Sequence, residues 1–172
     1  MRNLVTVMAV VLFSMPAFFS LAKDSYKKYT DDQKYNFTVE VPEKWVVENI
    51  KNGLVFSGKQ GTEEYNTTIT FQFIPKQTGK TLDSEVEKFL SQMKTAQKFK
   101  LISKESCKLS GVPGCKIRVS YQAPGTAELF SQEQYITETK SCFCWLGYTA
   151  PSDLFDKYHA VITHAAQTVK FP

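Results

Sequence analysis

The sequence contains few histidines and none of the common catalytic or nucleotide-binding motifs. No G-x-S-x-G elbow, phosphate-binding loop or dinucleotide fingerprint is present. The two histidines, His159 and His164, are five residues apart on an expected helix, so they point about 140° away from each other and cannot form an i,i+4 metal pair. We therefore expect no catalytic residue, no metal and no cofactor, and a protein that is not an enzyme.

A basic stripe of the kind that binds nucleic acid is also absent from the sequence. The 21 basic and 17 acidic residues are interleaved along the chain and give a net charge of +4. A nucleic-acid footprint needs lysines and arginines clustered on one face. We expect no nucleic-acid partner.

Long apolar runs are missing except at the N-terminus. Arg2 precedes the apolar segment from Leu4 to Met15, and the small residues Ser20 and Ala22 form a cleavage site. Residues 1–22 are thus predicted to be a signal peptide; the alternative, an uncleaved membrane anchor, is disfavoured because the apolar run is short. The expected product is exported, periplasmic in a bacterium or secreted, with no stable membrane span after cleavage.

The polar segment 23–34 lacks periodicity and is predicted to be a flexible lead-in. A single domain then covers residues 35–172. Its first half contains alternating apolar patterns typical of strands, and Asn52-Gly53 is a strong hairpin signal. The strands are expected at 35–41, 45–50, 54–57 and 68–74.

Two helices are expected from apolar residues at helical spacing. In the first, between Leu82 and Met93, either Ser84 with Glu87 or Thr81 is the predicted cap. In the second, between Leu154 and Val169, Ser152 is the predicted cap. Four further strands, at 99–109, 115–121, 128–137 and 141–149, lie between these helices and should form hairpins. This order predicts an α+β fold, in which an antiparallel sheet is covered by helices.

Several of these segments resemble the PsbP/Mog-like family. The similarity lies in the strand Tyr35-x-Phe37-x-Val39-x-Val41-Pro42-x-x-Trp45, in the mid-chain helix, and in the closing Tyr148-Thr149-Ala150, Phe155-x-x-Tyr158 and Val169-x-Phe171. The resemblance implies a PsbP/Mog-like layered sandwich and a non-catalytic binding or assembly role, with an envelope or secreted protein as partner. It implies no active-site residue, and the cysteines are not part of the family pattern.

Four cysteines in an exported chain raise the question of disulfides. Cys107 and Cys115 flank one hairpin turn and are predicted to form a bridge. A two-residue Ser-Gly turn would displace them by one position, which a bulge at Pro113-Gly114 could restore.

Cys142 and Cys144 form a possible second thiol pair, on the same face of a strand and about 6.5 Å apart along it. We expect them to be structural thiols or a strained bridge. The alternative is a thiol-disulfide oxidoreductase that uses both cysteines, although a strand lacks the helix N-terminus that usually lowers a thiol pKa. A zinc site would need two further ligands. A third hypothesis, suggested by the aromatic content of 13%, is a carrier of small apolar ligands.

Overall fold

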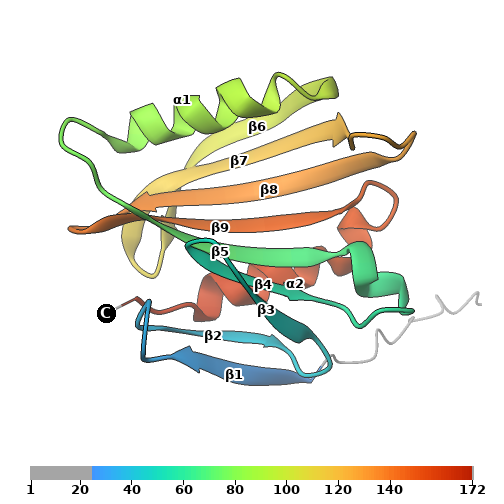
Figure 1. The fold of residues 1–172 in the computed structure, drawn as a ribbon, viewed down its shortest axis with the longest axis horizontal. Coiled ribbons are helices and arrows are strands. Elements are labelled where there is room, and N and C mark those ends of the chain that lie inside the picture. Colours follow the sequence, from blue (N-terminus) through green and yellow to red (C-terminus); the bar gives the residue numbers. More distant parts are fainter. Residues whose placement is uncertain (1–24, 172) are drawn as a thin grey trace, which may run out of the picture.

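The computed structural model describes residues 25–171, so the predicted signal peptide lies outside the described residues. Within these residues the chain forms nine strands, two α-helices and a short 3-10 helix (Figure 1). In chain order these are β1 Tyr26–Asp31, β2 Phe37–Pro42, β3 Val46–Ile50, β4 Gly53–Ser57, the 3-10 helix Glu63–Asn66, β5 Thr68–Pro75, α1 Leu82–Met93, β6 Gln97–Leu109, β7 Val112–Gln122, β8 Leu129–Glu138, β9 Cys142–Pro151 and α2 Phe155–Thr168.

Seven of the strands form one antiparallel sheet in the order β3-β4-β5-β9-β8-β7-β6. Strands β6 to β9 are joined by short turns and lie next to each other, because such turns permit only antiparallel neighbours. The long excursion through α1 takes the chain from the middle of the sheet to its far edge. The predicted α+β class, with an antiparallel sheet covered by helices, is confirmed.

The two helices cover opposite faces of this sheet (Figure 1). Helix α1 packs on β7 and β8, and its Phe89 meets Trp145 of β9 edge to face. Helix α2 packs on β9 and on β2, and buries Phe155, Val161 and Ile162. Because side chains alternate along a strand, β9 supplies Phe143 and Trp145 to the α1 face and Cys144 and Leu146 to the α2 face.

A separate two-stranded sheet, β1 and β2, lies beside α2 and completes the larger core. Phe37, Val39 and Val41 of β2 are buried there. The prediction that 23–34 is a flexible lead-in was wrong for Tyr26–Asp31, which is strand β1. The alternation of buried and exposed side chains expected of a strand is hard to see in this segment, because both of its lysines are exposed. Strand β1 pairs with β2, and the ring of Tyr29 packs on that of Phe56 with the centroids 5.0 Å apart.

The structure shows which residues lie at the N-terminal caps of the two helices. Thr81, the alternative candidate, caps α1 and exchanges hydrogen bonds with Ser84 in a capping box. Ser152 does not cap α2, which begins at Phe155 after an N-cap residue, Leu154, that makes no side-chain capping bond. The hydroxyl of Ser152 instead lies 3.0 Å from that of Ser131.

Within residues 25–171, neither helix is long and apolar enough to cross a membrane.

Candidate functional site

A cavity of about 850 Å³ opens at one end of the large sheet. Five segments that are far apart in the sequence contribute to it: the approach to β2, the end of β5 with the start of α1, the β6–β7 turn, the β8–β9 turn and the C-terminus. The lining residues are Tyr35, Phe73, Lys76, Leu82, Ser110, Val112, Pro113, Glu138, Thr139, Lys140, Ser141, Cys142, Cys144 and Phe171. Its size is within the range of small-molecule sites.

Three aromatic rings form the apolar wall of the cavity. Phe73 stacks on Tyr35 with ring centroids 4.5 Å apart, and Phe171 meets Phe73 edge to face at 6.2 Å. Phe73 is 8% exposed and also contacts Phe37 of the core. The hydroxyl oxygen of Tyr35 is buried without a hydrogen-bond partner in the structure. The wall is therefore an extension of the α2-side core that reaches the surface.

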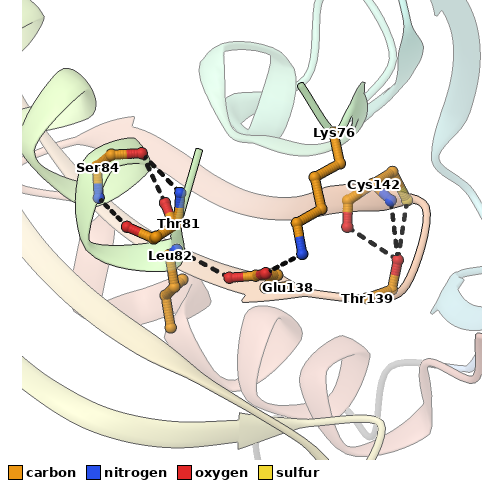
Figure 2. Close-up of polar contacts among 7 residues, drawn as sticks. All are labelled: Lys76, Thr81, Leu82, Ser84, Glu138, Thr139 and Cys142. Atoms are coloured by element: carbon orange, nitrogen blue, oxygen red, sulfur yellow. Dashed lines mark hydrogen bonds and ion pairs between the residues drawn. The ribbon is translucent and has the colours of Figure 1, made fainter. Parts of the chain in front are cut away.

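An ion pair marks the polar side of the cavity (Figure 2). Lys76, just beyond β5, pairs with Glu138 at the end of β8, and the other oxygen of Glu138 accepts a hydrogen bond of 2.9 Å from the backbone N–H of Leu82. The hydrogen bond from Lys76 lowers the pKa of Glu138, and the contact with Leu82 acts in the same direction. A carboxylate at this position also suits the positive end of the α1 dipole.

The β8–β9 turn is held by Thr139 (Figure 2). Its hydroxyl donates to the carbonyl oxygen of Cys142 at 2.8 Å and accepts from the N–H of Cys142 at 3.1 Å. The same hydroxyl lies 3.3 Å from the sulfur of Cys142. Lys140, at the tip of this turn, is exposed and lines the cavity. The turn thus fixes the backbone that carries the first thiol.

The structure brings Cys142 and Cys144 together at the cavity wall. Their Sγ atoms are 3.6 Å apart, and both thiols are free. Cys144 is buried and Cys142 is half-buried. Burial, and then the proximity of Cys142, raise the pKa of Cys144 well above its ordinary value. Because the thiolate is the nucleophile, the reactivity of Cys144 is suppressed.

The predicted bridge between Cys107 and Cys115 is not formed; both thiols are free. The turn has two residues, Ser110 and Gly111, so Cys107 pairs with Gly114 and Ser106 with Cys115. This offset of one position places the two side chains on opposite faces of the sheet, where Cys107 joins the α2-side core and Cys115 the α1-side core. The bulge that could have restored the match does not occur there; the irregularities of this pair of strands lie nearer Gln97 and Leu101.

A second polar cluster lies on the α2 face of β8. Glu133 is only 3% exposed, accepts a hydrogen bond of 2.8 Å from the hydroxyl of Tyr135, and lies 3.2 Å from Nε2 of His159. Burial, followed by the charge of Glu133, raises the pKa of Tyr135. Asp156, three residues before His159 on the same helix, pairs with Arg118. No large cavity of those described is lined by this cluster, and its groups satisfy one another.

His164, the other histidine, lies 2.8 Å from a carboxylate oxygen of Glu40 on β2. The two histidines therefore contact different carboxylates on different strands, as their spacing indicates. No group of three or more His, Cys, Asp or Glu side chains suited to a metal occurs within residues 25–171.

Sequence reasoning identified the thiol pair but not the cavity around it. In the sequence, Tyr35 and Phe171 stand near the two ends of the predicted domain. Lys76, Glu138 and Lys140 look like ordinary charged residues of loops. Their convergence depends on the strand order, in which β5 lies next to β9. No local sequence pattern indicates that β5 and β9 are neighbours in the sheet.

No protein-family model matches the chain, and no curated relative matches it. Solved structures do. Cyanobacterial PsbP (CyanoP) from Synechocystis sp. PCC 6803 aligns with a TM-score of 0.63 at 14% identity, over 89% of this chain and 96% of CyanoP. LpqN of Mycobacterium tuberculosis, described as involved in cell envelope biogenesis, aligns with a TM-score of 0.58 at 13% identity, over 87% of this chain and 92% of LpqN.

A protein of unknown function from Pseudomonas aeruginosa, PA94, aligns with a TM-score of 0.59 at 14% identity, over 83% of this chain and 94% of PA94. These similarities define a class of small α+β proteins. The chain has the PsbP-like fold, as the sequence resemblance predicted.

Proposed function

We propose that this protein is an exported, non-catalytic binding module of the cell envelope, and that the cavity at the end of its sheet is where it binds a protein partner. The observation that carries the proposal is the cavity itself. Its aromatic wall suits an apolar side chain, and its rim carries the charges of Lys76, Glu138 and Lys140. Protein–protein interfaces combine an apolar centre with a polar rim in the same way.

The chemistry of the thiols supports a non-catalytic role. A thiol-disulfide oxidoreductase needs a thiol that ionises near neutral pH. Of the two cysteines that such an enzyme would use, Cys144 is buried, and burial raises its pKa well above its ordinary value. The proposed export is supported by LpqN, which shares the fold and is described as involved in cell envelope biogenesis.

The test is recovery of partners by the mature protein from its own compartment, with and without a blocked cavity. Ser141 is exposed at the cavity rim, so Ser141→Trp should fill the opening. Ser91 is exposed on α1 and does not line the cavity, so Ser91→Trp is the matched control. We expect a stoichiometric partner that Ser141→Trp loses and Ser91→Trp retains. Equal recovery by both variants would refute the assignment of the cavity.

A second candidate function, a carrier of small apolar ligands, is favoured by the three contacting rings of Tyr35, Phe73 and Phe171. Native mass spectrometry of the protein from its own compartment separates the two functions. A co-purified small molecule that Ser141→Trp displaces would favour the carrier. A ligand-free protein that recovers a partner would favour the binding module.

A further inference from the structure

The two thiols in the cavity wall are closer together than their positions on a strand require. Residues two apart on a strand are separated by about 6.5 Å along it, whereas the Sγ atoms of Cys142 and Cys144 are 3.6 Å apart. Both side chains must therefore turn toward each other. Both also line the cavity, so a small ion can reach them from solvent.

We propose that Cys142 and Cys144 form a binding site for Cu(I), in which both sulfurs coordinate the ion as thiolates at the cavity wall. This site is independent of the protein partner proposed above. Each thiol loses its proton to solvent as the ion binds, and no electron is transferred.

The donor set selects the class of metal. Soft thiolate ligands favour soft ions such as Cu(I), whereas carboxylate and carbonyl oxygens suit Mg²⁺ and Ca²⁺. Glu138, the carboxylate that lines this cavity, is already engaged by Lys76 and by the N–H of Leu82. The histidines are engaged elsewhere, with Glu133 and Glu40.

The number of donors distinguishes Cu(I) from zinc. Structural zinc needs four ligands in a tetrahedron, and within residues 25–171 no cluster of three such side chains exists. Two thiolates alone satisfy an ion that accepts low coordination, as Cu(I) does. The pair is thus a poor zinc site and a suitable Cu(I) site.

The geometry allows the ion to enter without a change of backbone. With metal–sulfur bonds of about 2.3 Å, a separation of 3.6 Å corresponds to an S–Cu–S angle of about 103°. A linear arrangement needs about 4.6 Å between the sulfurs. Cys142 is only half-buried, so its side chain can rotate toward the cavity and supply that increase.

The charges of the cavity compensate the charge of the complex. One Cu(I) ion and two thiolates carry a net charge of −1. Lys76, Lys140 and Glu138 line the cavity, and these two positive groups and one negative group leave a net charge of +1. Lys140 lies in the turn that leads to Cys142, and its charge is opposite in sign to that of the complex.

The experiment adds Cu(I) to the reduced protein without oxygen, in competition with the chelator bathocuproine disulfonate. The matched variants are Cys142→Ser/Cys144→Ser and Cys107→Ser/Cys115→Ser. We expect the wild type and the second variant to bind one equivalent of Cu(I). The first should bind more than about 100-fold more weakly, because loss of outer partners alone costs up to that factor.

A measurement on the wild type avoids any effect of substitution on folding. Cu(I) should protect the half-buried Cys142 from alkylation, as read by peptide mapping, while the labelling of Cys115, which is also half-buried, should not change. The proposal is overturned if the wild type takes up no Cu(I), if Cys142→Ser/Cys144→Ser binds it as well as the wild type, or if Cys115 is protected as much as Cys142. Uptake of Zn²⁺ but not Cu(I) would also overturn it.

Discussion

Phe73 connects the core to the cavity, so its replacement tests both. In Phe73→Ala the ring that contacts Tyr35, Phe37 and Phe171 is removed from a site that is 8% exposed. Removal of a buried phenylalanine costs about 3–5 kcal/mol. The lower end applies here because the cavity already leaves one side of the ring without packed neighbours, so we expect a loss of about 3 kcal/mol in the free energy of unfolding.

Urea denaturation of the reduced protein measures this loss. With an m-value of about 2 kcal/mol/M, the midpoint should fall by about 1.5 M. Phe130→Ala is the control, since Phe130 is half-buried and stacks only on Tyr121, at 6.4 Å; it should cost about 1 kcal/mol. A fall of less than about 0.5 M for Phe73→Ala, or equal effects of the two variants, would refute the packing described for the cavity wall.

Four further predictions follow from the described contacts and from the sequence. Thr81→Ala should lower the free energy of unfolding by about 1 kcal/mol in denaturant titration, because α1 loses its capping box; an unchanged midpoint would contradict the cap. Glu138→Gln should lower the melting temperature at neutral pH. Because Lys76 depresses the folded pKa of Glu138, its contribution is present above the ordinary value of 4.5 and is lost as the pH falls through the folded pKa. The difference from wild type should therefore vanish in acid, and a difference that grows in acid would show the opposite sign. In the reduced, metal-free protein Cys144 should react with iodoacetamide at pH 8 far more slowly than in urea, because burial raises its pKa; equal rates by peptide mapping would contradict its burial. Intact-mass analysis of the exported protein should find Lys23 at the N-terminus, and a full-length species in the membrane would contradict the predicted signal peptide.

The strands and helices that carry their own periodicity were predictable from the sequence. Phe37, Val39 and Val41 alternate as a half-buried strand, and the stripe from Leu82 to Met93 matches α1. Strand β1 was missed because its two aromatic residues, Tyr26 and Tyr29, are three positions apart and so point to opposite faces, which leaves no alternating pattern in an otherwise polar segment.

Residue spacing alone does not predict which cysteine side chains lie close together in the fold. A change of one residue in the length of the β6–β7 turn would move Cys107 and Cys115 to the same face, and the sequence left the turn length open. Cys142 and Cys144 were predictable as a pair because two residues on one strand share a face whatever the register. The 3.6 Å between their sulfurs depends on side-chain rotation and on the packing against Phe73 and Thr139, which no local pattern specifies.

The most direct test of the central claim, that the cavity is the binding site, is photocrosslinking from its rim. A photoreactive benzoylphenylalanine is placed at position 140, the exposed tip of the β8–β9 turn beside the opening, or, as the control, at position 91, and the cells of origin are illuminated. Position 141 is not used, because a large side chain there should block the opening. The account predicts one partner crosslinked in good yield from position 140 and little or none from position 91. The same product from both positions, or a product from position 91 alone, would contradict it.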